Sequence, residues 1–456
     1  MICTLLLIFS SFVQRLQALP GVDNVQTHTY KEILPDNIRK ERKPYYDSAR
    51  TIYTEYISFT IEQPIDHRNP EFGTFKQRIE LQLTDLQKPV VLLTEGYHRP
   101  NKMRLLIDPI ALHLHANTIA VEHRYFGHSK PEDKEFVYLD TYQAAADWHR
   151  VYTLLSSIFN TPWIATGTSK SGISTTLFAY YFPNDMKLYV PFMAPFCESR
   201  HDLRVGKYIT QFAGTSTQRD TIRMAKQYAL TQVPNMAKEI CKRLKCKDLL
   251  TTDSTTVYAN IRWLIFEHFF HQWSYIPVSS GWIKQVPVNQ ANAKQLVDYY
   301  IGKKNSKEMK KYKPIGPQYD LSTPIYPYYI QAMRELGHYI HDVNEFRYLG
   351  ATDEDYTIDA QVSYDDRIQL QQQEMDNRVM MDIANHWIYN TSCRMIFVYG
   401  ANDPWTGAGI NPDIHNKNNN ITYYLIDEGI HSPYLITYIN QKQVEELLNE
   451  IDNIIR

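Results

Sequence analysis

The sequence predicts an α/β fold in which a mostly helical segment interrupts the core. Stretches typical of strands and helices alternate up to about residue 197, and this alternation resumes only after residue 384. The last predicted strands need the earlier ones to complete a sheet, so we expect an inserted cap and not two consecutive domains. The expected core domain comprises residues 50–197 and 385–456, and residues 198–384 form the cap.

Short apolar runs predict the buried strands of the core. Val90–Thr94 and Asn117–Val121 are apolar almost throughout, which is typical of strands that are covered on both faces. An alternating pattern at 56–61 and 74–83 predicts an antiparallel edge. The other predicted strands are 163–165, 188–192, 394–399 and 421–426.

Apolar residues recur at helical spacing between these strands. Residues 141–159, with Asp140 or Thr141 as the N-cap, predict a helix before the strand at residue 163. A final helix is expected at 441–455, whereas the polar residues 21–50 predict no more than an ordered arm. In the cap, the predicted helices cover about 219–246, 257–275, 291–303 and 326–339.

The composition excludes several functional classes. Lysine and arginine total 48 against 50 aspartate and glutamate, and no long block of like charge is present, so we expect no nucleic-acid partner. No motif in the sequence predicts a binding site for a metal ion or an organic cofactor. The 34 tyrosines fit either an aromatic-lined pocket or an aromatic-rich core.

The N-terminal residues resemble a secretory signal. The apolar run Ile2–Val13 is followed by Leu16-Gln17-Ala18, which approximates a small-residue cleavage site. The run is too short to span a bilayer, and no other segment is apolar enough to do so. We therefore expect a signal peptide at residues 1–19 and a secreted or periplasmic protein without a membrane span. No basic region precedes the run, so a misassigned start or a membrane-tethered N-terminus are the alternatives.

Four cysteines lie outside the predicted signal, an even number that suits an oxidising compartment. A disulfide between Cys241 and Cys246, another between Cys197 and Cys393, and buried free thiols are all compatible with the sequence. Cys241 and Cys246 do not predict a zinc site, since no second close pair of ligands completes one.

A serine lies on the turn between a predicted strand and a predicted helix, in Gly167-Thr168-Ser169-Lys170-Ser171-Gly172. The nucleophile elbow of an α/β-hydrolase has this setting, and its sharp turn requires small residues on both sides of the nucleophile. Gly167 and Ser171 occupy these two positions. Glycine is usual where Ser171 stands, so the match is imperfect, and a serine that only caps the helix is the alternative.

An α/β-hydrolase requires an acid and then a histidine later in the chain, each after a strand. Asp403 follows the strand predicted at 394–399, and His431 follows the one at 421–426. The order therefore predicts a catalytic triad. Ser169 is the nucleophile, His431 is the base that takes its proton, and Asp403 orients the imidazole.

Two backbone N–H groups are expected to bind the developing oxyanion, those of Lys170 and Tyr97. The Lys170 side chain itself is expected to be solvated. Glu122, His123 and Arg124 follow a predicted buried strand, where an unpaired charge would be costly. We therefore expect Glu122 and Arg124 to support the loop within a buried network, in preference to a catalytic role for Glu122 or His123.

Several motifs together resemble serine peptidase family 37, over roughly residues 55–436. The family comprises secreted tripeptidyl and prolyl-tripeptidyl aminopeptidases and is distantly similar to lysosomal prolyl carboxypeptidase. The resemblance implies an exopeptidase that removes short peptides, often of three residues and sometimes ending in proline, from the free N-terminus of peptide substrates. Two glycines normally follow the family's elbow, so Ser171 is a departure. The motifs are Gln63-Pro64-Ile65-Asp66-His67, Gly73-Thr74-Phe75-Lys76-Gln77-Arg78, Glu122-His123-Arg124-Tyr125-Phe126-Gly127, Gln143-Ala144-Ala145-Ala146-Asp147, the elbow, and Asn402-Asp403-Pro404-Trp405.

A carboxylate in the cap would suit this specificity, because it can pair with the substrate α-ammonium and limit the length of the released peptide. The candidates are Glu267 and Glu335, and each would otherwise form a surface ion pair on a helix. Two other functional classes remain: a carboxylesterase that uses the same triad, and an inactive binding protein on this fold. The intact Ser169, Asp403 and His431 argue against the second.

Overall fold

A β-sheet of nine strands forms the centre of the part of the chain that the computed structural model describes, residues 12–35, 38, 42–132, 136–314, 323–356, 374–433 and 440–456. Its strand order is β1-β2-β3-β5-β4-β6-β7-β8-β9. The strands are β1 (Val22–His28), β2 (Glu55–Pro64), β3 (Thr74–Leu83), β4 (Val90–Thr94), β5 (Asn117–Val121), β6 (Trp163–Thr168), β7 (Leu188–Phe192), β8 (Met395–Gly400) and β9 (Ile421–Ile426).

The sheet begins with antiparallel pairs and continues with parallel ones. β1, β2, β3 and β5 pair antiparallel, whereas β5, β4, β6, β7, β8 and β9 are parallel neighbours. The carboxyl ends of the parallel strands therefore meet at one edge of the sheet. This is the arrangement of the α/β-hydrolase fold, as the sequence predicted. β1 was not predicted, because it comes from the segment expected to be an arm.

Helices cover both faces of the sheet. On one face, α5 (Thr141–Leu155) and α6 (Lys170–Tyr181) pack on alternate strand residues such as Leu92. On the other face, α4 (Pro109–Leu114) and α19 (Gln441–Ile455) pack on their neighbours, such as Val91. Two further helices, α2 (Tyr30–Ile33) and α3 (Lys43–Ile52), lie near the sheet's first strands.

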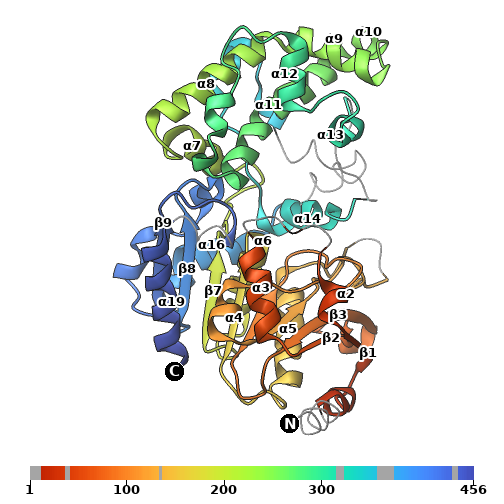
Figure 1. Ribbon diagram of the computed structural model, residues 1–456, viewed down its shortest axis with the longest axis vertical. Coiled ribbons are helices and arrows are strands. Elements are labelled where there is room, and N and C mark those ends of the chain that lie inside the picture. The colour runs from red at the N-terminus through yellow and green to blue at the C-terminus, as the bar shows by residue number, and fades with distance from the viewer. Residues whose placement is uncertain are drawn as a thin grey trace.

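The cap leaves the core after β7 and has a hydrophobic core of its own. Figure 1 shows its helices gathered at one end of the molecule, away from both chain termini. Its longest helix, α11, carries buried residues along most of its length, among them Ile261, Ile265, Phe269 and Trp273. The cap helices are α7 (Leu203–Gln211), α8 (Ser216–Thr231), α9 (Val233–Leu244), α10 (Leu249–Thr252), α11 (Ser254–Tyr275), α12 (Ala293–Tyr300) and α13 (Lys307–Lys311).

A second group of short helices leads back from the cap to β8. It comprises α14 (Tyr326–Gln331), the π-helical turn η5 (Ala332–Leu336), the 3-10 helices η6 (Asn344–Leu349) and η7 (Asp353–Tyr356), α16 (Arg378–Asp382), the π-helical turn η9 (Ile383–Trp387) and α17 (Ile388–Asn390). Ile383 and Ile388 pack into the core of the sheet. This connection therefore belongs partly to the cap and partly to the sheet domain.

The N-terminal segment predicted as a signal peptide packs against the sheet domain where it is described. Residues 12–17 are helical, and Phe12 and Leu16 are buried. The ring of Phe12 lies 5.8 Å from that of Phe159 and meets it edge to face. Residues 1–11 of the predicted signal lie outside the described residues. Within the described ranges, no helix combines the length and the apolar character that a membrane span requires.

The four cysteines beyond residue 19 carry free thiols. Of the alternatives that the sequence left open, the structure therefore has free thiols, and those of Cys197, Cys241 and Cys393 are buried. The pKa of Cys241 is raised to about 12, mainly by burial and to a smaller extent by a hydrogen bond with the Cys246 thiol. Cys241 is therefore a protonated thiol at neutral pH.

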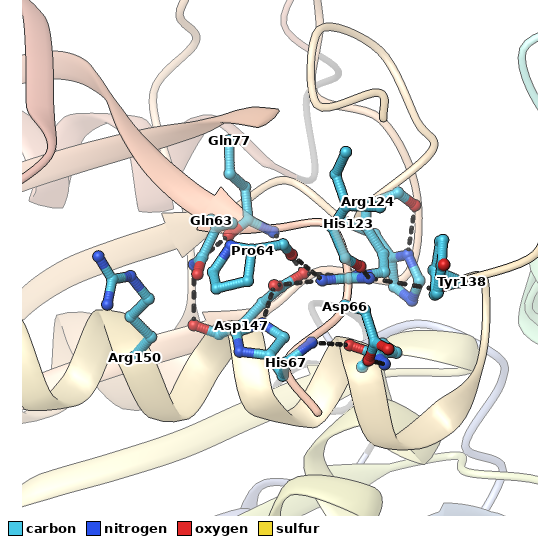
Figure 2. A network of polar contacts seen from close by, with 12 residues as sticks. Gln63, Pro64, Asp66, His67, Gln77, His123, Arg124, Tyr138, Asp147 and Arg150 are labelled. Carbon is cyan, nitrogen blue, oxygen red and sulfur yellow. Dashed lines mark hydrogen bonds and ion pairs between the residues drawn. The ribbon is translucent and has the colours of Figure 1, made fainter. Parts of the chain in front are cut away.

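Arg124 and Asp147 form a buried ion pair between the sheet and α5 (Figure 2). The guanidinium donates to both carboxylate oxygens, at 2.8 and 2.7 Å, and to the Ile65 carbonyl at 2.9 Å. Burial, the largest single effect, raises the pKa of Asp147, but the charges and hydrogen bonds of Arg124 and His67 together outweigh it and the pKa is lowered. His67 bonds the same carboxylate at 2.8 Å, so this network ties β2 and the segment after β5 to α5.

Glu122 and His123 also have structural partners. The Glu122 carboxylate accepts the backbone N–H groups of Arg99 and His128 and the hydroxyl of Ser129. His123 contacts the Arg124 carbonyl through Nδ1 at 2.8 Å, and its burial holds its pKa well below the usual value. The residues after β5 thus support a loop, as expected. The Glu122 carboxylate does so by accepting hydrogen bonds from the loop residues Arg99, His128 and Ser129, and not by pairing with Arg124.

We predict that Asp147→Asn destabilises the fold by about 3–5 kcal/mol, because it leaves the Arg124 charge buried without a counterion. The midpoint of guanidinium unfolding, followed by tryptophan fluorescence, measures this effect. Asp47→Asn is the matched control, since Asp47 pairs with Lys43 at 2.7 Å on the surface. Exposed pairs contribute little, so the control midpoint should not change. Equal shifts in both variants would contradict the prediction.

Candidate active site

Ser169 lies on the tight turn between β6 and α6. Its backbone has φ +62° and ψ −125°, a conformation that non-glycine residues rarely adopt. The Ser169 N–H donates to the Phe192 carbonyl of β7 at 2.9 Å, which holds the turn against the neighbouring strand. Such strain persists where the surrounding structure enforces it, and it is concentrated at functional sites.

The close packing of this turn explains its glycines. A Cβ atom on Gly167 would lie 2.5 Å from the Ser171 carbonyl oxygen, and one on Gly172 would lie 2.6 Å from the Phe192 carbonyl oxygen. Both obstacles are backbone atoms, so neither can give way by changing rotamer. The serine at position 171 is accommodated, and its Oγ accepts the Gly96 N–H at 2.8 Å.

Asp403 and His431 form a hydrogen-bonded pair at the ends of β8 and β9. His431 Nδ1 lies 2.7 Å from Asp403 Oδ2, and both side chains are buried. The other carboxylate oxygen accepts the Trp405 N–H at 3.0 Å. Because an ionised carboxylate only accepts, Nδ1 carries the hydrogen, and Nε2 of the neutral ring is left as the acceptor.

The loops that carry this pair are held by the core and by the cap. A Cβ atom on Gly400 would lie 2.5 Å from the Gly429 carbonyl carbon. The end of β8 and the loop after β9 therefore lie closer together than a residue with a side chain at position 400 would permit. The His431 N–H donates to the Ser274 carbonyl of α11 at 2.8 Å. The ring of Tyr275, from the same helix, meets the His431 ring edge to face at 5.9 Å.

The segment after β4 lies directly against the nucleophile turn. Lys170 Nζ donates to the Gly96 carbonyl at 2.7 Å, and the Gly96 N–H donates to Ser171 Oγ. Arg99 then bridges Glu95 and Glu80, at 2.9 Å to each. This segment, residues 95–99, carries the Tyr97 N–H that was predicted to bind an oxyanion, and we call it the oxyanion loop.

The Lys170 side chain is buried, which corrects the expectation that it is solvated. It is 3% exposed, and Nζ lies 5.1 Å from the ring centre of Phe126 and 5.5 Å from that of Tyr97. Burial lowers the pKa of Lys170 to about 7. The sequence-based expectation was wrong because the side chain folds back onto the oxyanion loop and does not extend into water.

Ser169 opens into a cavity of about 180 Å³ between the sheet domain and the cap. Trp405 and Tyr275, which flank His431, also line this cavity. The walls are mainly aromatic and come from the oxyanion loop, α11, α14 and residues 338–341. The other lining residues are Tyr97, Lys170, Ile173, Pro195, Trp263, Glu267, Phe270, His271, Ile325, Tyr328, Tyr329, His338, Tyr339 and His341.

Glu267 is the one acidic side chain among the described residues that line the cavity. Its Oε2 accepts from the Tyr339 hydroxyl at 2.7 Å and from His341 Nε2 at 3.1 Å, and its Oε1 lies 3.1 Å from His271 Nε2. Burial, the largest single effect, opposes ionisation, but the hydrogen bonds and the charges of His271 and His341 together outweigh it and lower the pKa of Glu267. The carboxylate is therefore charged at neutral pH.

Glu335, the second carboxylate expected to bind the amine, is not among the residues that line the cavity. It lies in η5 and accepts the N–H of Thr141, the first residue of α5, at 3.0 Å. Burial, reinforced by the nearby charge of Asp140, raises the pKa of Glu335 to about 8. A carboxyl group that keeps its proton at neutral pH is a poor partner for an ammonium, so these surroundings favour Glu267 over Glu335 for that role.

The residues that surround Glu267 could not be identified from the sequence. Tyr339 and His341 are more than 70 positions away from it in the chain, and no local pattern links them to α11. The high tyrosine content was the only available signal, and it did not separate cavity residues from core residues. Tyr275 and Trp405 were missed for the same reason.

The fold and this site define the class: the protein is a serine-type enzyme of the α/β-hydrolase fold. A family model described as PS-10 peptidase S37 matches residues 34–431, so the chain belongs to this family of serine peptidases.

Two curated relatives are consistent with this assignment. The chain is 29% identical over 380 residues to "Prolyl tri/tetrapeptidyl aminopeptidase" of Streptomyces mobaraensis, covering 80% of this chain and 72% of the relative. It is 32% identical over 149 residues, 28% of each chain, to "Serine protease vicPb" of Bipolaris victoriae (strain FI3). Among solved structures, homoserine O-acetyltransferase of Staphylococcus aureus matches with 12% identity, a TM-score of 0.41 and coverage of 86% of this chain and 95% of that one.

Proposed function

We propose that this peptidase is an exopeptidase that releases short peptides from free N-termini, in particular tripeptides, including those that end in proline. The observation that carries the proposal is that Ser169 and the charged carboxylate of Glu267 line one cavity. A nucleophile and an ammonium anchor in one cavity would define the distance from the N-terminus to the scissile bond.

In the proposed mechanism, Ser169 Oγ attacks the scissile carbonyl while His431 Nε2 takes the hydroxyl proton. Asp403 holds the imidazole in this orientation through Nδ1 and stabilises the imidazolium. The N–H groups of Lys170 and Tyr97 bind the oxyanion. His431 then gives the proton to the leaving amine, which leaves an acyl-enzyme on Ser169. Water, deprotonated by His431, hydrolyses the acyl-enzyme and releases the peptide.

Glu267 has the capacity to bind an α-ammonium in this scheme. An ionised carboxylate offers about four acceptor positions, and Tyr339, His341 and His271 account for three contacts. One acceptor position therefore remains for the substrate. We assign the amine-binding role to Glu267 alone, because the Glu335 carboxyl is engaged by the N-terminus of α5.

Two observations support the proposal that the substrate can carry a proline next to the scissile bond. The cavity walls present flat aromatic faces, including Tyr97, Phe270, Tyr328 and Trp405, against which a pyrrolidine ring can pack. The Streptomyces relative carries the name of a prolyl tri/tetrapeptidyl aminopeptidase.

We predict that Ser169→Ala lowers kcat for a free-amine tripeptide anilide by on the order of a million-fold, because triad residues act as a unit. Release of the aniline, measured spectrophotometrically, tests this. The melting temperature should stay close to that of the wild type, since the change removes only one oxygen atom. A residual kcat within about tenfold of the wild type would exclude Ser169 as the nucleophile.

We predict that Glu267→Gln lowers the preference for a free amine. The ratio of kcat/KM for a free-amine tripeptide anilide to that for its N-acetylated form should fall by about tenfold or more, which corresponds to the loss of one charged hydrogen bond. Glu308→Gln is the control, because Glu308 is an exposed carboxylate of the cap. If the wild type cleaves both substrates equally well, the protein is not an exopeptidase, and a carboxylesterase-like hydrolase becomes the better assignment.

We also propose that the chain is exported, on the basis of the apolar run at Ile2–Val13. Removal of the predicted signal peptide, residues 1–19, would take Phe12 and Leu16 out of the core, at a cost of about 1.5–3 kcal/mol for each side chain. We therefore predict that a chain beginning at Pro20 melts at a lower temperature than one that keeps residues 12–19. N-terminal sequencing of protein from the culture medium identifies which form is released, and retention of all the protein inside the cells would contradict export.

A further inference from the structure

The buried Lys170 side chain contacts the peptide group that is proposed to bind the oxyanion. Nζ donates to the Gly96 carbonyl at 2.7 Å, and the N–H of the same peptide unit belongs to Tyr97. A trans peptide is planar, with its C=O and N–H pointing in opposite directions. Holding the oxygen therefore fixes the direction of the Tyr97 N–H.

We propose that the Lys170 side chain has a positioning role: it holds the Gly96–Tyr97 peptide so that the Tyr97 N–H remains aimed at the oxyanion. This inference rests on the proposed Ser169 chemistry. It assigns to one residue two separate tasks, since the Lys170 backbone N–H binds the oxyanion directly and the side chain orients the second donor.

The residue after Lys170 holds the other side of Gly96. Ser171 Oγ accepts the Gly96 N–H at 2.8 Å, so both peptide groups that flank Gly96 are bonded to the nucleophile turn. A Cβ atom on Gly96 would lie 2.9 Å from Lys170 Cγ and 2.9 Å from the Ser171 nitrogen. Only glycine permits this contact, and the turn and the oxyanion loop therefore form one rigid unit.

The charge of Lys170 would also strengthen the donor. A cation on the carbonyl side of a peptide polarises it and makes its N–H a better hydrogen-bond donor, and this effect is larger where water is excluded. Lys170 is 3% exposed and lies near the faces of Phe126 and Tyr97. Burial lowers the pKa of Lys170 to about 7, so the charged and the neutral side chain are both populated at neutral pH. Both carry an N–H for the Gly96 carbonyl, and the polarising effect belongs to the charged one.

The experiment compares Lys170→Met with the wild type on a free-amine tripeptide anilide and on the matching tripeptide ester. We expect kcat to fall by about 10²–10³-fold on both substrates, as for the loss of an oxyanion donor, with KM changed by less than about threefold. Affinity for a tripeptidyl boronic acid, which forms a tetrahedral adduct with Ser169, should fall in parallel with kcat. Affinity for the free tripeptide should not change.

Lys226→Met is the matched control. Lys226 is a second buried lysine, 5% exposed, and its Nζ lies 4.6 Å from the ring centre of Phe266 in the cap, away from the oxyanion loop. Its kcat should stay within about threefold of the wild type. If Lys170→Met proves unstable in thermal melting, Lys170→Ala assayed with added propylammonium replaces it, and recovery of kcat by the amine supports the inference.

Three outcomes would overturn the inference. They are a kcat for Lys170→Met within about threefold of the wild type, equal losses of affinity for the boronic acid and the tripeptide, and no recovery of Lys170→Ala by the amine. The ester separates this inference from the proposed function, because amide and ester hydrolysis share the tetrahedral oxyanion. A wild type that hydrolyses only the ester would refute the exopeptidase assignment, and the loss in Lys170→Met on the ester would still test the role of Lys170.

Discussion

The strained, positive-φ backbone of Ser169 is the constraint on which the rest of the site depends. Such a conformation costs about 1–3 kcal/mol and must be enforced by its neighbours. The Phe192 carbonyl of β7 accepts the Ser169 N–H, and the absence of a Cβ atom at Gly167 and Gly172 lets the first turn of α6 lie against the sheet. The parallel sheet thereby supplies the rigidity, and the strained turn presents the hydroxyl above the carboxyl ends of its strands.

One cap helix connects the chemistry to substrate recognition. Near its C-terminal end, α11 carries Glu267, which lines the cavity, and the Ser274 carbonyl, which accepts the His431 N–H. The helix is apolar on most of its faces and so is held inside the cap, with Phe266 and Phe269 in the cap core. A shift of α11 would therefore move the proposed amine anchor and the histidine loop together, which couples occupation of the cavity to the geometry of the triad.

The parts of the fold that the sequence predicted well are those governed by local patterns. Val90–Thr94 and Leu188–Phe192 are strands with the predicted bounds, because parallel strands covered on both faces are continuous apolar runs. β1 was missed because it is an edge strand whose residues are polar and mostly exposed. The order of Ser169, Asp403 and His431 was sufficient to locate candidate residues on strand ends. The surroundings of side chains that fold back on distant segments were not predictable. Lys170 was expected in water and is buried, and the sequence could not distinguish Glu267 from Glu335 as the carboxylate that binds the amine.

Ser171 illustrates how a departure from the usual elbow can be compatible with its function. With glycine at this position, the Gly96 N–H would lose its side-chain acceptor and would need another partner, because buried backbone donors are costly when unpaired. The serine satisfies that donor without obstructing the turn. The oxyanion loop is then bonded to Ser171 and Lys170 on one side and, through Arg99, to Glu80 on the other. A donor held from both sides does not have to reorganise as charge develops, and preorganisation of this kind accounts for most of the benefit that an oxyanion hole provides. The serine at 171 therefore strengthens the connection between the turn that carries Ser169 and the proposed second oxyanion donor.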